Sequence, residues 1–145
     1  MGVPLTRETE SSSKFVDETI RKYGSRVWIQ KQEDPLRVGT ADIYSVVDGM
    51  FIPMECKKVK EDRGNSILSH RFTRMQIKRM KDLLAAHAFP IGLIFYEKEK
   101  RYILPLAIRE DGNISMEEYL KLPIFDWMEV RNAATKAYLD RCRRF

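Results

Sequence analysis

Apolar residues in the first thirty positions change from a helical to a strand spacing. Over residues 10–23 they recur three or four positions apart, which predicts an amphipathic helix. These residues are Phe15, Val16, Ile20 and Tyr23. Gly24 follows directly, and glycine is common at the left-handed position that ends a helix. The run Val-Trp-Ile over residues 27–29 then predicts a short buried strand.

The strongest local signal in the chain is a hairpin. An apolar, β-branched run over residues 43–47 predicts its first strand, and Asp48-Gly49 is typical of a two-residue turn. Residues 50–58 should form the second strand and pair with the first in antiparallel fashion. Pro53 lies inside that run and has no backbone donor, so we expect a bulge or an edge-facing position there.

A polar stretch and a second helix follow the hairpin. Residues 58–70 are polar and long enough to form a loop. Residues 73–87 again show helical spacing, with a set of apolar residues expected to face inward. This set is Met75, Ile77, Met80, Leu83 and Leu84.

The remainder of the chain predicts two strands and a helical end. The strands are expected over residues 90–96 and 101–106, joined by a charged turn. Ser115, with Glu118 three residues later, is typical of a capping box that begins a short helix. A last helix is expected over about residues 130–144.

This order of elements predicts an α/β fold with a central mixed β-sheet flanked by helices. A length of 145 residues fits one domain with its own core. We therefore expect a single domain, with a core over about residues 10–106 and a helical C-terminal extension over residues 107–145.

Composition and charge narrow the function only slightly. No apolar run approaches the ~20 residues that a membrane helix needs, and the first residues lack the apolar stretch of a secretory signal. We therefore expect a cytoplasmic protein, in the host cytoplasm if a phage encodes it. Cys56 and Cys142 form no CxxC or His/Cys cluster, which argues against a zinc site or a disulfide framework. The formal net charge of +5 favours an anionic partner.

Three polar residues stand where the hairpin should bring them together. Asp42 heads the first strand, while Glu55 and Lys57 lie near the end of the second. Because strand side chains alternate, Glu55 and Lys57 share one face and Cys56 points to the other. Two converging carboxylates suit Mg²⁺ or Mn²⁺, and a lysine beside them can orient a water or offset phosphate charge. An ExK triplet alone is usually only a solvated strand face, so the position of Asp42 is what favours phosphodiester hydrolysis.

The run from Gly39 to Asp42, followed after twelve residues by Glu55-Cys56-Lys57, resembles the PD-(D/E)xK signature of restriction-endonuclease-like nucleases. Asp42, Glu55 and Lys57 match that motif, whereas Ala41 stands where the family often has a structural proline. Over residues 70–106 the chain is most similar to Holliday junction resolvases of the Hjc and RecU type, phage-type enzymes included, and it shows VRR-NUC-like features. The resemblance implies a restriction-endonuclease-like core and a Mg²⁺-dependent DNA endonuclease, with Mn²⁺ able to substitute.

The resemblance also assigns two further residues. Glu10 resembles the glutamate that completes the metal site in VRR-NUC and archaeal resolvase sequences, with Glu18 as the competing choice and a plain capping or surface role as the alternative. Gln76 resembles the glutamine of RecU-type resolvases and VRR-NUC domains. The implied catalytic set is Asp42, Glu55, Lys57, Glu10 and Gln76. The implied metal ligands are Asp42, Glu55 and Glu10.

Basic residues around this site are expected to hold DNA phosphates, which position the duplex without reading its sequence. The expected DNA-binding residues are Lys31, Arg37, Lys58, Lys60, Arg63, His70, Arg71 and Arg74. Lys78 and Arg79 are better explained as the charged, solvated face of a helix.

The leading hypothesis is a Holliday junction resolvase that makes paired symmetric nicks in branched DNA as a homodimer, since a twofold pair supplies two active sites. Another PD-(D/E)xK nuclease, such as a VRR-NUC-type flap or nicking enzyme or a restriction-like enzyme, is the alternative within enzymes. A non-catalytic DNA-binding module is the alternative outside them. The apolar residues of the C-terminal tail would either form a subunit interface or complete the fold. They are Leu122, Ile124, Phe125 and Trp127.

Overall fold

The structure of the chain is a computed structural model that describes residues 7–32, 41–60, 67, 68 and 70–143. Arg37 and Arg63, two of the expected DNA-binding residues, lie outside the described residues. The elements are α1 (Arg7–Tyr23), a 3-10 turn η1 (Gly24–Arg26), β1 (Val27–Lys31), β2 (Ile43–Val47), β3 (Met50–Phe51), β4 (Met54–Lys58), α2 (Arg74–Ala85), β5 (Ile91–Tyr96), β6 (Glu99–Ile103), a 3-10 turn η2 (Pro105–Ala107), α3 (Met116–Leu120) and α4 (Trp127–Cys142).

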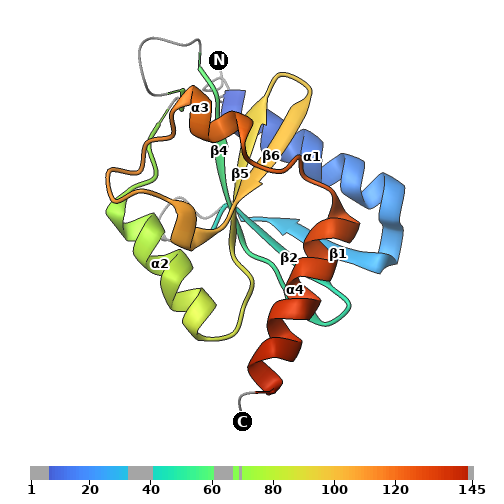
Figure 1. Cartoon of the computed structure of the whole chain (residues 1–145). Coiled ribbons are helices and arrows are strands. Elements are labelled where there is room, and N and C mark those ends of the chain that lie inside the picture. Colours follow the sequence, from blue (N-terminus) through green and yellow to red (C-terminus); the bar gives the residue numbers. More distant parts are fainter. Residues whose placement is uncertain (1–6, 33–40, 61–66, 69, 144–145) are drawn as a thin grey trace.

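The strands form one mixed sheet in the order β1-β2-β4-β5-β6, with β3 paired to β2. Strands β4 and β5 run parallel, and the other neighbouring pairs are antiparallel. Helices flank this sheet (Figure 1), so the expected α/β fold with a central mixed sheet is confirmed. Among the described helices, none combines the length and apolar character that a bilayer-spanning segment needs.

Each face of the sheet has its own hydrophobic cluster. The first joins α1 and α4 to the sheet through residues such as Phe15, Trp127 and Val130. The second lies on the opposite face and joins α2 and α3 to the sheet through Phe72, Met80 and Tyr119 among others. Alternation along β4 explains the separation, because Cys56 belongs to the first cluster while its neighbours Glu55 and Lys57 point the other way. The two polar side chains are therefore buried on the α2 side of the sheet.

The tail residues mostly complete the fold. Trp127 is 3% exposed, stacks on Phe15, and donates a hydrogen bond from its indole nitrogen to Thr19 Oγ1 at 3.1 Å. Phe125 packs against the same cluster, and Leu122 packs against the second cluster. Ile124 is the exception, since 56% of its surface is exposed.

Pro53 interrupts the second strand of the hairpin, as expected from its missing donor. Residues 50–58 form two strands, β3 and β4, and residues 52 and 53 lie between them. Ser45 bridges the gap, because its Oγ donates to Ile52 O at 2.6 Å and its own carbonyl accepts from Ile52 N at 2.8 Å.

Several boundaries differ from those expected. Strand β6 covers residues 99–103, not 101–106, because Tyr96 pairs with Glu99 across a two-residue turn and Pro105 begins a 3-10 turn. Helix α4 begins three residues early, since the Asp126 carboxylate caps it by accepting from the backbone N–H of Met128 and Glu129.

The inward orientation expected for Met75 is wrong. This side chain is 51% exposed, as is that of Ile20 in α1. Helix α2 begins at its cap residue Thr73, and this start turns Ile77 and Met80 toward the sheet as its buried residues. Leu83 and Leu84 are half-buried.

Candidate active site

Asp42 and Glu55 lie side by side on neighbouring strands. Ile43 of β2 pairs with Met54 of β4, so the residue before β2 and the second residue of β4 become neighbours. Asp42 is fixed there by a hydrogen bond, since its Oδ2 accepts from the backbone N–H of Cys56 at 2.7 Å. The hairpin thus converts a separation of thirteen positions in sequence into two adjoining carboxyl groups.

Glu55 is one of the most deeply buried polar side chains that the structure describes, with 2% of its surface exposed. Burial raises the pKa of its carboxyl from 4.5 to about 9, and the negative charge of the neighbouring Asp42 acts in the same direction. The positive charges of Lys57 and Arg79 oppose this shift. Glu55 therefore holds a proton at neutral pH unless a cation replaces it.

Lys57 is buried beside this pair, with 5% of its surface exposed. Its ammonium lies over the ring of Phe72, 5.5 Å from the ring centre, in cation–π geometry. Gly92 makes room for that ring, because it pairs with Glu55 across β4 and β5 and a Cβ atom there would lie 2.8 Å from Phe72. A buried lysine thus has a defined position next to the two carboxyls.

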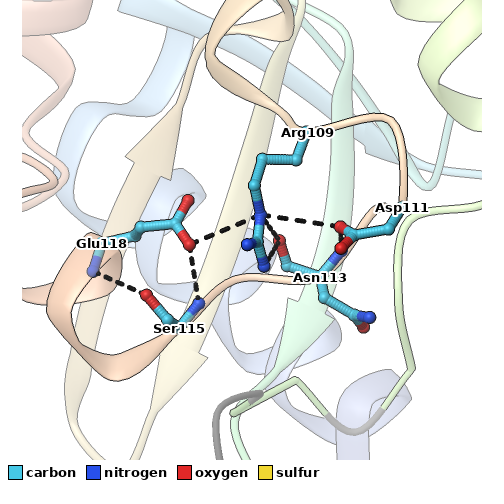
Figure 2. A network of polar contacts seen from close by, with 5 residues as sticks. All are labelled: Arg109, Asp111, Asn113, Ser115 and Glu118. Carbon is cyan, nitrogen blue, oxygen red and sulfur yellow. Dashed lines mark hydrogen bonds and ion pairs between the residues drawn. The ribbon is translucent and has the colours of Figure 1, made fainter.

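The loop before α3 holds Phe72 in place. Gly112 O accepts from Phe72 N at 2.9 Å, and Gly112 has a φ of +74° with no room for a Cβ atom against the Phe72 carbonyl. A polar network around Arg109 fixes this loop (Figure 2), with Asp111 and Glu118 as ion-pair partners and Asn113 O as an acceptor. The loop therefore supports the ring on which Lys57 lies.

Gln76 approaches the carboxyl pair from α2. Its Nε2 donates to Glu55 Oε2 at 3.3 Å. Its Oε1 accepts from the backbone N–H of Thr73 at 2.9 Å, while its own N–H donates to Thr73 Oγ1 at 3.1 Å. This capping box orients the amide, because only the oxygen can accept from Thr73 and the NH₂ group is left to face Glu55.

The carboxyl pair fits a divalent cation. Glu55 Oε1 is buried and has no hydrogen-bond partner in the described part of the chain. A buried oxygen without a donor costs free energy, and hard oxygen ligands from two carboxylates are what Mg²⁺ takes. Asp42 and Glu55 are therefore the residues that would hold the ion.

The structure does not gather Glu10 or Glu18 with this pair. Among the described residues, His, Cys, Asp and Glu side chains form no cluster of three or more that could hold a metal ion. Glu10 is exposed at the start of α1. Glu18 is 3.6 Å from Lys100 Nζ on β6 and forms an ion pair with it.

The expected DNA-binding residues that the structure describes fall into two groups. Lys60, His70, Arg71 and Arg74 are exposed around the start of α2 and the end of β4. Lys31 and Lys58 are half-buried, and their ammonium groups donate to Ser13 Oγ at 2.9 Å and Ser11 Oγ at 3.1 Å. The second group thus also fixes the start of α1 against the sheet.

Sequence patterns missed Arg79, Phe72 and Gly92. Arg79 was expected on a solvated face, yet it is half-buried and its charge acts on Glu55. Its spacing of three from Gln76 was the available signal, because residues three apart share a helix face. Lys78 fits the original expectation, since its exposed side chain pairs with Asp82 at 2.9 Å.

Comparison with known proteins supports the fold. No family model matches the chain, and no curated protein matches it. Among solved structures, the chain is similar to Hjc, a Holliday junction resolvase from the archaeal hyperthermophile Archaeoglobus fulgidus, with a TM-score of 0.58 and 9% identity. The match covers 78% of this chain and 94% of that one. At this identity the similarity shows a shared restriction-endonuclease-like fold and nothing finer.

Proposed function

We propose that this protein is a divalent-metal-dependent DNA endonuclease with its active site at Asp42, Glu55 and Lys57. The observation that carries the proposal is the pair of adjoining carboxyls with a buried lysine beside them. One oxygen of this pair, Glu55 Oε1, lacks a hydrogen-bond partner among the described residues. A purely structural site would not need a buried carboxyl next to a half-buried one, since the two repel each other when ionised.

The residues divide the chemistry of phosphodiester hydrolysis among them. Asp42 and Glu55 would hold Mg²⁺, which when bound polarises the phosphate and lowers the pKa of a coordinated water. Lys57 donates to the attacking water or to the charge that develops on the phosphate, and its burial strengthens that interaction. Gln76 donates a hydrogen bond to one oxygen of Glu55, which would leave the other oxygen available as a metal ligand. Glu10 is proposed as a third ligand on the family resemblance alone, since the described structure does not gather it with Asp42 and Glu55.

We further propose a four-way DNA junction as substrate and a homodimer as the active form. The fold similarity to Hjc, whose name states this activity, supports the substrate. The net charge of +5 and the exposed basic residues Lys60, His70, Arg71 and Arg74 support binding to a polyanion. A junction offers two equivalent strands, and a twofold dimer would present one active site to each.

The test is cleavage of a labelled four-way junction and a matched linear duplex, in Mg²⁺ and in EDTA. The wild type is compared with Asp42→Asn, which removes a proposed ligand, and with Asp140→Asn, which removes an exposed carboxylate near the end of α4. We expect paired symmetric nicks in the junction that require metal, persist in Asp140→Asn and fall by at least about 100-fold in Asp42→Asn, since metal chemistry is lost with its ligand.

Other outcomes separate the alternatives. Cleavage of flaps or linear duplex in place of junctions would retain the active site but assign the chain to VRR-NUC-type or restriction-like enzymes. DNA binding without metal-dependent cleavage of any of these substrates would contradict catalysis and favour a binding module.

A further inference from the structure

Arg79 lies one helical turn after Gln76 on the same face of α2. Gln76 touches Glu55 with its amide, so the neighbouring position on that face also lies over the carboxyl pair. Arg79 is half-buried, whereas the side chain of Lys78, the preceding residue, is 77% exposed. The two cations therefore have different surroundings despite being adjacent in the chain.

The guanidinium of Arg79 lies near the carboxyl pair and has no ion-pair partner among the described residues. Its charge lowers the pKa of the Glu55 carboxyl, which places it within electrostatic reach of the site. Three other arginines, Arg101, Arg109 and Arg131, form ion pairs with Glu99, Glu118 and Asp48 respectively. Within the described residues Arg79 forms no such ion pair, and a guanidinium carries five N–H donors that suit phosphate oxygens.

We propose that Arg79 is a phosphate-binding residue of this site, which holds a non-bridging oxygen pair of the DNA phosphate that enters beside Asp42 and Glu55. The planar guanidinium matches phosphate oxygens bidentately, which an ammonium cannot do. Two carboxylates would otherwise repel an incoming phosphate, and a cation on α2 offsets that repulsion from the side opposite the sheet. This inference rests on the proposed endonuclease function and adds a residue to its substrate-binding surface.

The test measures binding of a labelled junction and a labelled duplex in EDTA, across a series of salt concentrations. Arg79→Met removes the charge but keeps an apolar side chain of similar length. Arg79→Lys keeps the charge but removes the planar guanidinium that can bind phosphate through two N–H groups. Lys78→Met is the matched control on the solvent side of the same helix. We expect Arg79→Met to raise Kd about tenfold and to reduce the slope of log Kd against log salt by about 1, the share of one phosphate contact.

Arg79→Lys should keep the slope and bind several-fold more weakly, and Lys78→Met should change Kd less than about twofold. Thermal melting confirms that each variant is folded, and Arg79→Gln replaces Arg79→Met if that variant does not fold. If Arg79→Met matches Lys78→Met in both Kd and slope while the wild type still cleaves DNA in Mg²⁺, the phosphate role is overturned and the endonuclease proposal stands. If the wild type neither binds nor cleaves any of these DNAs, the phosphate role of Arg79 and the endonuclease proposal are both contradicted.

Discussion

The central feature at the scale of single residues is the buried carboxyl of Glu55, for which burial favours the protonated form and raises the pKa to about 9. Sequence could predict that Asp42, Glu55 and Lys57 converge, because strand alternation and hairpin pairing fix which side chains share a face. It could not predict their burial, which depends on how α2 and Phe72 cover that face of the sheet.

The raised pKa of Glu55 predicts that the metal-free protein loses stability as pH rises. A folded-state pKa of about 9 lies above the ordinary value of 4.5, so folding favours the protonated form. The contribution of Glu55 is therefore fully present below about pH 4.5 and is lost progressively as pH rises toward 9. Within that window each pH unit should lower the free energy of unfolding by about 1.4 kcal/mol.

Urea denaturation between pH 5 and pH 8 in EDTA measures this slope. Glu55→Gln should flatten it, because the amide does not titrate, and Mg²⁺ should restore stability to the wild type at pH 8 by replacing the proton. Asp140→Asn provides a carboxylate control at an exposed position near the end of α4. A wild-type slope equal to that of Glu55→Gln would contradict a strongly raised pKa.

At the scale of elements, the start of α2 serves both helix capping and the site. The side chain of Gln76 caps the Thr73 backbone with its oxygen and contacts Glu55 with its nitrogen. The capping-box pattern, Ser or Thr followed three residues later by Glu or Gln, occurs at Ser115 and also at Thr73, so the sequence predicts both helix starts. The contact of Gln76 with Glu55 could not be predicted in the same way, because it depends on the placement of α2 over β4, and a local sequence pattern holds no information on that tertiary contact.

Thr73→Ala should therefore affect the site as well as the helix. Removal of an N-cap hydroxyl costs about 0.5–2 kcal/mol of stability. It also loosens the backbone that orients the Gln76 amide, so we expect Mg²⁺ affinity, measured by calorimetry, to fall several-fold. Ser115→Ala removes the equivalent cap of α3 and should lose similar stability with unchanged Mg²⁺ affinity. Equal losses of affinity in both variants would indicate general loosening instead of a positioning role for Thr73.

At the scale of the whole molecule, the two faces of the sheet have different roles. Helices α1 and α4 cover the face opposite the site, and their shared cluster includes Phe15, Val130 and Cys56. Because α4 packs on the same sheet as α1, we propose that residues 107–145 belong to a single domain with the rest of the chain. The role of the tail could not be predicted from the sequence, because its apolar residues suit a subunit interface as well as a core. The stacking of Trp127 on Phe15 favours the core role.

Trp127→Ala should unfold or strongly destabilise the monomer. Truncation of a buried aromatic side chain costs about 3–5 kcal/mol, and here it also leaves Thr19, which is 3% exposed, without its hydrogen bond from the indole. Ile124→Ala is the matched tail control, and it should cost less than about 0.5 kcal/mol because that side chain is 56% exposed. Denaturant unfolding at several protein concentrations separates the two roles of the tail. If Trp127→Ala loses stability to the same extent at every protein concentration, the tail completes the fold. If the monomer keeps its stability and only self-association weakens, Trp127 acts at a subunit interface.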